Sequence, residues 1–328
     1  MNTTKKMLAI LLVLGMMSMT LIACNNGGNT TDPGTSQGNS EANTQAPSGD
    51  VATQYGNYYT DKPARTLEEI FADKIQHTSN TFATGSSYSD DKIAKVYKIA
   101  NCIANYESYV EEYGVQDQLN DLYEQTGFTL DLGFGAEMVK HYIDMTGDTY
   151  DYTARMEELL AHPKVSAAQV TCINAAMKAA ENLVKDGQSG ISVNQNQPMS
   201  FTSLKSTDGT VYFALGSYHT MADLSNVQRT GDTLSATVTF RIVDYYDWGE
   251  DIKTPEFTSY LEKLDESYRT LLGEMVDMPT LESFCQADLA QLHYAGFAQN
   301  FLAHGTIVYN VTWTAGQSFS DATVTPAQ

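Results

Sequence analysis

The sequence predicts an α+β fold, in which an N-terminal helical region is followed by a mostly antiparallel sheet backed by two helices. Apolar residues recur at helical spacing, every three or four positions, from about residue 65 to residue 187. After residue 200 the spacing changes to two, which is the period of a half-buried strand. Two further helical segments then precede a last strand. Segregated helices and strands of this kind are typical of the α+β class.

The helical region is expected to span residues 57–199. Thr66-Leu67-Glu68-Glu69 has the pattern of a capping box and predicts a helix start. Ser89 or Asp90 can cap a second helix, which we expect to end near Gly114. Later helices are predicted over 116–125, 134–145, 150–161 and 163–187, with a polar loop over 188–199.

The α+β region is expected over residues 200–316 and is predicted to pack with the helical region as one unit. A strand is predicted at 211–215, and residues 218–228 and 234–242 are predicted to pair across a turn at Gly231-Asp232. Helices are predicted from Pro255 to about 271 and over 280–303, and a final strand over 307–313. This order argues against a two-lobed solute-binding protein, because such folds repeat strand–helix units throughout.

The N-terminus has the features of an export signal. Lys5 and Lys6 precede an apolar run over 7–19, which is shorter than the roughly 20 residues that a membrane-spanning helix needs. The run leads into Leu21-Ile22-Ala23-Cys24, which resembles the lipobox of bacterial lipoproteins. The resemblance implies a signal peptide at 1–23, lipidation of Cys24 and a place on the outer side of the cell membrane. An ordinary secretory signal with a chance cysteine is the alternative.

Residues 24–56 are predicted to form a lipidated, disordered tether. Between residues 25 and 50 the chain contains no Leu, Ile, Val, Phe, Tyr or Trp, so it cannot bury enough apolar surface to offset the entropy of ordering. A flexible chain of this length spans roughly 25–30 Å. The tether would therefore lift a folded domain off the bilayer.

The chain is strongly acidic, with a formal net charge of −21. Removing 1–23 would remove Lys5 and Lys6 and no acidic residue, which leaves −23 for the remainder. Such a surface repels nucleic acid, so we exclude nucleic acid as a partner. An acidic, solvated surface explains the charge most simply, although a cationic partner or a bound metal is compatible with it.

Three cysteines follow Cys24, namely Cys102, Cys172 and Cys285. Cys172 lies on an apolar helical stripe, and the three do not have the spacing of a metal site. We expect all three to be reduced core residues, with one disulfide as the alternative. We predict neither a metal site nor a cofactor.

Established catalytic motifs do not occur in the chain. It contains no HExxH, no GxSxG and no phosphate-binding glycine loop. Ser89 and Lys92 have the spacing found in some acylating enzymes, but Ser89 stands where a helix cap is expected. Asp144, Asp148 and Asp151 depart from the spacing of a calcium loop.

One group of residues is a candidate site. The strand at 234–242 runs into Asp244-Tyr245-Tyr246-Asp247-Trp248-Gly249, and a predicted helix carries His293, Gly296 and Asn300 on one face. The candidate catalytic residues are Asp247, Asp244, Tyr246 and His293, and the candidate ligand-binding residues are Trp248 and Asn300. Carboxylates, a phenol and a histidine can form a general acid–base site with an aromatic wall. The alternative is structural: the aromatic residues cover the core, and Gly296 permits close packing.

These residues also carry a resemblance. The order is Gly216-Ser217, then Asp244-x-Tyr246-x-Trp248, then Leu292-His293-x-x-Gly296-x-Ala298-x-x-Phe301. It looks like a C-terminal domain of various exported bacterial proteins, including some that are toxin-like, and it covers residues 200–315.

A shorter resemblance concerns chemistry. Asp244-x-Tyr246-Asp247 is similar to the catalytic motif of colicin M-type bacteriocins, which hydrolyse the cell-wall precursor lipid II. The resemblance implies that Asp247 is the catalytic carboxylate and that Asp244 and Tyr246 support it. The basic residue expected shortly after that motif is absent, since the next one is Lys253, and only His293 can take its place.

Two functions are therefore expected. The first is a cell-envelope lipoprotein with a non-catalytic binding or interaction domain, which is held at the membrane by its lipid anchor and engages a cell-envelope ligand. The alternative is a hydrolase that acts on a lipid-linked cell-wall precursor or a peptidoglycan-type substrate.

Overall fold

In the computed structural model, residues 59–61, 63–77, 85–195, 200–204 and 208–327 are described. The predicted signal peptide, the lipidation site Cys24 and the tether at 24–56 lie outside these residues. Within the described ranges, no helix is both long enough and apolar enough to cross a membrane.

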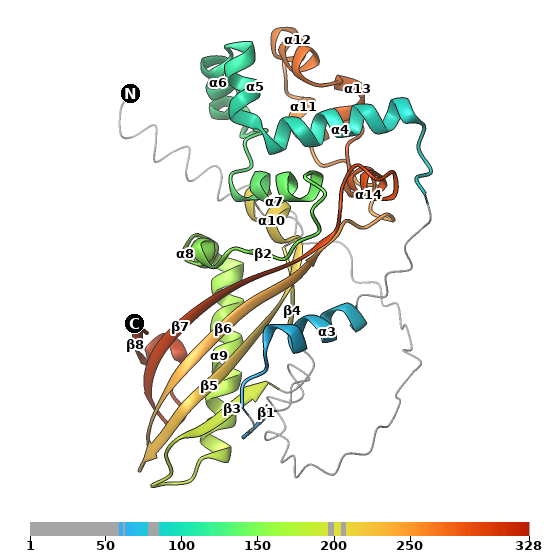
Figure 1. Cartoon of the computed structure of the whole chain (residues 1–328). Helices are drawn as coiled ribbons and strands as arrows, with labels where there is room; N and C mark the ends of the chain where they lie inside the picture. Colours follow the sequence, from blue (N-terminus) through green and yellow to red (C-terminus); the bar gives the residue numbers. More distant parts are fainter. Residues whose placement is uncertain (1–58, 62, 78–84, 196–199, 205–207, 328) are drawn as a thin grey trace, which may run out of the picture. The chain divides into compact units, whose positions relative to one another are not determined.

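The fold is α+β, as the sequence predicts. Three long strands, β5 (Ser217–Thr230), β6 (Thr233–Tyr246) and β7 (Phe301–Thr314), form the middle of the sheet (Figure 1). The strand order is β1-β3-β5-β6-β7-β2, with β4 also paired to β5 and β8 to β7, and every pair except β2–β7 is antiparallel. The shorter strands are β1 (Tyr59–Thr60), β2 (Tyr150–Asp151), β3 (Ile191–Gln195), β4 (Ser200–Ser203) and β8 (Thr323–Pro326).

The predicted hairpin is confirmed. β5 and β6 are joined through Gly231, whose φ of 60° is in the left-handed region that glycine adopts without strain. Along β6 the apolar residues from Leu234 to Ile242 all face the main core, because side chains alternate between the two faces of a strand.

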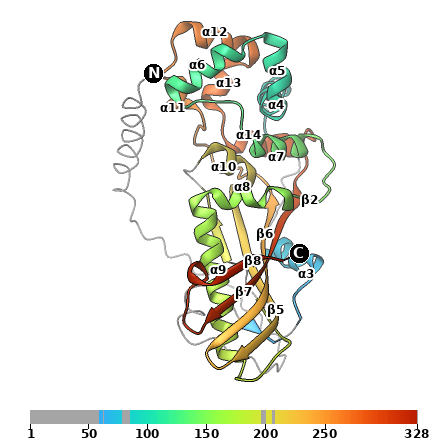
Figure 2. The same cartoon turned by 90° about the vertical axis from the view of Figure 1, so that its left-hand side faces the viewer.

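Two helices cover opposite faces of the sheet. α9 (Pro163–Leu183) packs on the face that carries the main core, and α3 (Leu67–His77) covers the other face (Figures 1 and 2). Under α3, Ile70 and Phe71 form a small separate cluster with Met221 and Val243. α9 therefore covers the main core face of the middle strands, and α3 covers part of the other face.

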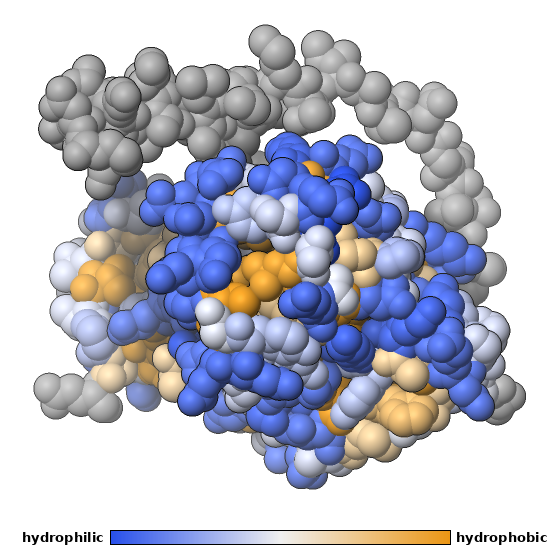
Figure 3. Space-filling view, turned by 90° about the horizontal axis from the view of Figure 1, so that it is seen from above, coloured by the Kyte–Doolittle hydropathy of each residue, from blue (hydrophilic) through white to orange (hydrophobic). Residues whose placement is uncertain are grey.

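Most of the remaining helices gather beyond the end of the sheet where β6 ends and β7 begins (Figure 1). Their surface is mostly hydrophilic, with hydrophobic residues visible in a hollow between them (Figure 3). These helices are α4 (Asp90–Ala104), α5 (Tyr106–Tyr113), α6 (Gln116–Thr126), α7 (Phe134–Ile143), α11 (Thr258–Leu261), α12 (Glu266–Met275), α13 (Met278–Ser283) and α14 (Gln286–Tyr294).

The predicted strand at Val211, Phe213 and Leu215 is wrong. These residues lie in a short helix, α10 (Gly209–Leu215). The Asp208 side chain accepts a hydrogen bond from the Thr210 amide at 2.9 Å and caps the helix start, and Gly216 with a φ of 55° ends it. Cap chemistry on both sides prevails over the alternating pattern, which three apolar residues cannot establish alone.

The predicted helix over 280–303 is also wrong in extent. It is divided into α13 and α14, and β7 already begins at Phe301. The helix predicted from Pro255 is likewise divided into α11 and α12, because the Asp265 side chain accepts from the Ser267 and Tyr268 amides and caps a new helix that starts at Glu266. Capping residues thus start new helices within the two segments that periodicity alone predicts to be continuous.

The helical region contains short strands that its pattern does not predict. The expected loop at 188–199 includes β3, and the expected helix at 150–161 consists of β2, a 3₁₀ turn (Thr153–Arg155) and α8 (Met156–Ala161). The helix from Asp90 breaks at Asn105 into α4 and α5. The predicted helices at 116–125, 134–145 and 163–187 are confirmed as α6, α7 and α9.

The cysteines Cys102, Cys172 and Cys285 are buried, as expected, and none is bonded to another. Burial raises the pKa of the Cys102 and Cys172 thiols to about 12, so both are protonated at neutral pH. They behave as small apolar core residues.

Candidate functional site

The residues singled out in the sequence meet at one end of the sheet. In the last pair of the β6–β7 ladder Tyr246 lies opposite Phe301, and Asp247 and Asn300 are the next residues beyond that pair. The end of α7 lies next to the segment before β7, because the Tyr142 carbonyl accepts a hydrogen bond from the Gln299 amide at 2.8 Å. We call Asp247, Trp248, His293 and Asn300 the strand-end site.

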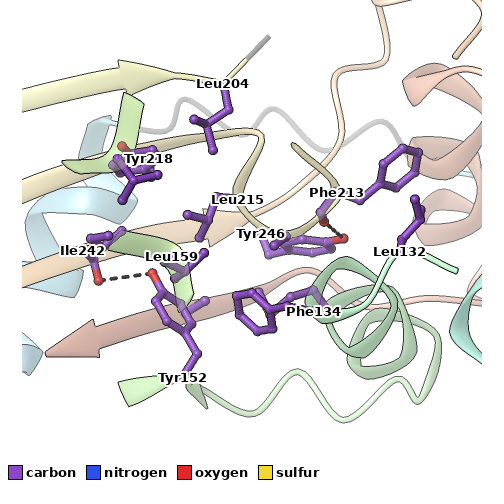
Figure 4. Close-up of a cluster of buried hydrophobic side chains, with 14 of the residues drawn as sticks. Leu132, Phe134, Tyr152, Leu159, Leu204, Phe213, Leu215, Tyr218, Ile242 and Tyr246 are labelled. Carbon is purple, nitrogen blue, oxygen red and sulfur yellow. Dashed lines mark hydrogen bonds between the residues drawn. The ribbon is translucent and has the colours of Figure 1, made fainter. Parts of the chain in front are cut away.

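Tyr246 belongs to the core beneath this site. It is 3% exposed, and its hydroxyl donates to the Phe213 carbonyl of α10 at 2.8 Å (Figure 4). Its ring stacks on Phe301 at 4.8 Å between ring centroids and meets the edge of Trp248 at 5.4 Å. Burial raises the pKa of the hydroxyl well above 10, so it remains a hydrogen-bond donor.

Asp244 is buried as well. It has the same parity on β6 as Ile242 and Tyr246 and therefore points into the main core. Burial raises the pKa of the Tyr152 and Tyr246 hydroxyls, and the nearby charge of Asp244 adds to this rise. Asp244 is thus an electrostatic neighbour of two core tyrosines, and it does not lie at an open surface.

Asp247 differs from these two residues, because it is exposed. Burial, and secondly the Asp247 charge, raise the pKa of the Tyr142 hydroxyl. The pKa of the Tyr294 hydroxyl is also raised, by burial and by the charges of Glu250, Asp247 and Asp251. Three exposed carboxylates therefore lie near the Tyr294 hydroxyl at the end of α14.

His293 lies at this end of α14 and is half-buried, with Nδ1 at 3.3 Å from the Ala298 carbonyl. Gly296 does not permit the close packing expected of it, since a Cβ there would meet nothing within 4 Å. Its φ of 77° instead ends the helix, with Gly296 N–H donating to the His293 carbonyl and Phe297 N–H to the Leu292 carbonyl. Gly296 therefore fixes how the chain leaves α14.

Trp248 and Asn300, the predicted ligand-binding pair, share one property. They are 8% and 9% exposed, and Trp248 Nε1 and Asn300 Oδ1 are buried atoms that make no hydrogen bond. A buried polar atom without a partner costs roughly 1–3 kcal/mol. A ligand that supplied a partner would recover part of this free energy.

A second polar group lies on the opposite face of the sheet, beside α3, and we call Asp151, Asp223, Arg241 and His304 the His304 cluster. Arg241 Nη1 lies 2.5 Å from Asp223 Oδ2, and both side chains are largely buried. His304 Nδ1 is buried without a hydrogen bond, 3.8 Å from Asp151 Oδ1, and the ring lies 5.8 Å from that of Phe71. The cluster therefore combines a buried ion pair with a histidine.

Sequence periodicity and motifs do not single out this cluster. Its members come from four strands, β2, β5, β6 and β7, so no linear spacing unites them. One signal was present: Arg241 interrupts the otherwise uncharged polar face of a strict strand. Among the residues with described positions, no group of His, Cys, Asp and Glu is arranged to hold a metal ion.

Comparisons with known proteins add no relative. A scan against protein-family models matched no family, and searches of curated proteins and of solved structures found no similar protein. The resemblances to an exported C-terminal domain and to colicin M-type bacteriocins therefore stay predictions.

The His304 cluster predicts a pH-dependent stability. Burial lowers the His304 pKa below 6.5, the Asp151 charge opposes this, and the Arg241 charge adds to it. The folded protein then binds fewer protons at this site than the unfolded chain, so the site's contribution is fully present above pH 6.5 and is lost as the pH falls.

In a His304→Gln variant this acid-dependent loss should disappear. Urea unfolding of wild type and variant is measured at about pH 7.5 and about pH 5. The free energy of unfolding of the wild type minus that of the variant should be smaller at the lower pH. An equal difference at both pH values would contradict the lowered pKa.

Proposed function

We propose that this chain is a cell-envelope lipoprotein, anchored through Cys24, whose α+β part binds a component of the envelope without catalysing a reaction. The observation that carries the proposal is the division of the strand-end residues. Tyr246 and Asp244 are built into the core, whereas Asp247 is exposed and Trp248 and Asn300 each keep an unsatisfied polar atom. Exposed charge beside unsatisfied polar atoms supports binding.

The hydrolase alternative has less support. A general acid or base must reach the proton that it transfers, directly or through one water. The Tyr246 hydroxyl is buried and already donates to Phe213, and Asp244 faces the core. Only Asp247 and His293 are then left for proton transfer, and the motif of the colicin M resemblance loses two of its three members.

The anchor and the tether suit a binding role. The flexible part of the predicted tether, residues 25–50, has a root-mean-square span of roughly 25–30 Å, so it would hold the α+β part near the bilayer, where envelope components are concentrated. Tethering raises the effective concentration of a ligand held at the same membrane, so a site of modest intrinsic affinity suffices.

The anchoring part predicts the behaviour of a Cys24→Ala variant. Without the thiol that accepts the lipid, the protein should leave the membrane fraction and appear in secreted or unprocessed forms. Detergent partition of wild type and variant measures this. Cys102→Ala is the matched control, because Cys102 is buried, and this variant should stay in the membrane fraction. Unchanged membrane association of Cys24→Ala would refute the anchor.

The binding part is tested with lipid II and with peptidoglycan fragments. Full-length protein in a non-ionic detergent should bind one of them without forming a product, and Asp247→Asn should weaken this binding. Product formation that Asp247→Asn or His293→Ala abolishes would establish the hydrolase instead. Absence of binding to either probe would contradict the proposed class of ligand.

A further inference from the structure

We propose that the strand-end site takes an organic cation, namely an amine that carries an apolar or aromatic group. This inference rests on the proposed function, because it names the ligand class of the same site. Four features lead to it: clustered negative charge, aromatic rings, an unsatisfied hydrogen-bond acceptor, and an exposed apolar patch that includes a residue with a strained backbone.

The charge around the site is negative. Asp247, Glu250 and Asp251 are all exposed, and all three act on the Tyr294 hydroxyl at the end of α14. Tyr294 is half-buried, and its hydroxyl is close enough to these carboxylates for their charges to raise its pKa. Carboxylates together with aromatic faces attract organic cations, since the ring quadrupole and the negative charges act in the same direction.

An independent feature points to a hydrogen-bond donor in the ligand. Asn300 Oδ1 is an acceptor in a residue that is more than nine-tenths buried, and it has no partner. The β6–β7 ladder ends at Tyr246 and Phe301, so Asp247 and Asn300 are the first residues beyond its last pair and lie at the same end of the sheet. An ammonium group has three donors and no acceptor, which matches a carboxylate and an amide oxygen together.

An apolar patch adjoins this place. Phe297 and Met145 are 47% and 48% exposed, and the Tyr97 ring lies 5.8 Å from that of Phe297. We call these three residues the Met145–Phe297 patch. Its two loops are in contact, because the Gln299 amide donates to the Tyr142 carbonyl and a Cβ at Gly147 would lie 2.9 Å from Gln299. Apolar groups gathered in this way mark interaction surfaces.

The backbone at Met145 supports a role in contact with a ligand. Met145 has a φ of 61°, a left-handed conformation that disfavours every residue with a Cβ, and it follows the C-cap of α7, where glycine is common. The chain nevertheless places an exposed thioether there. Strained residues persist where their side chain serves a purpose, and an adaptable apolar contact is the purpose that methionine suits.

Three probes with the same ring and different charge test the proposal: phenethylamine, 2-phenylethanol and phenylacetate. Full-length protein in a non-ionic detergent is titrated with each, and binding is followed by ligand-observed NMR. Phenethylamine should bind roughly 3–10-fold more tightly than the neutral alcohol, and phenylacetate most weakly. Added salt should reduce the preference, because it screens the carboxylates.

Matched variants separate charge from apolar contact. Asp247→Asn should weaken phenethylamine roughly 3–10-fold and leave 2-phenylethanol unchanged, whereas Glu124→Gln on α6 should change neither. Met145→Gly should weaken both probes while its Tm stays the same or rises, since the strain is relieved. Tyr123→Ser removes an exposed ring on α6, outside the Met145–Phe297 patch, and should have no effect on binding.

Equal binding of the three probes, preference for phenylacetate, or loss of amine binding in the α6 variants would overturn the proposal. Failure of all three probes to bind would overturn it as well. If lipid II or a peptidoglycan fragment binds but no amine preference exists, the proposed function stands and this inference fails. If the amine preference exists but no envelope component binds, the strand-end site takes an organic cation and the proposed envelope ligand is wrong.

Discussion

Three buried tyrosine hydroxyls join segments that lie far apart in the chain. Tyr142 of α7 donates to the Leu289 carbonyl of α14, Tyr152 to the Ile242 carbonyl of β6, and Tyr246 to the Phe213 carbonyl of α10. The bonds join residues 147, 90 and 33 positions apart, so they are long-range contacts that local sequence preferences do not produce. Burial raises the pKa of each hydroxyl, which keeps it protonated and able to donate.

These bonds also determine what the strand-end site can do. Because Tyr246 is fixed at the end of β6 by its hydroxyl and by stacking on Phe301, the following residue Asp247 turns outward and Trp248 packs back against the core. A short motif is thereby divided between the interior and the surface. The division explains why a motif that suggests acid–base chemistry in the linear sequence supports a binding surface in three dimensions.

How far the sequence predicted the fold depended on the range of the interaction. The class, the β5–β6 hairpin and helices such as α9 follow from periodicity over ten or more residues, and these were predicted. α10 and the division between α13 and α14 depend on single caps at Asp208, Gly216 and Cys285, which a short apolar pattern does not reveal. The strand β3 pairs with β5 far along the chain and has little local signal.

The site was predicted in the same uneven way. The sequence singled out Asp247, His293 and Asn300 by residue type, at the end of a recognisable strand and on a predicted helix, although that helix was wrongly expected to continue past Asn300. It did not show that Tyr246 and Asp244 point inward, since that depends on strand parity continuing to the last residue of β6. The His304 cluster was missed, because cross-strand neighbours such as Val243 and His304 are set by register alone.

Tyr→Phe substitutions at 142, 152 and 246 test whether the three tyrosine hydroxyls are structural. Each removes one buried donor and its hydrogen bond, which should lower the free energy of unfolding by roughly 0.5–1.5 kcal/mol in urea titrations. Tyr123→Phe at an exposed position is the control and should change it little. At temperatures where the variants remain folded, Tyr246→Phe should bind phenethylamine as the wild type does. A Tyr246→Phe variant as stable as the control, but unable to bind, would contradict the account.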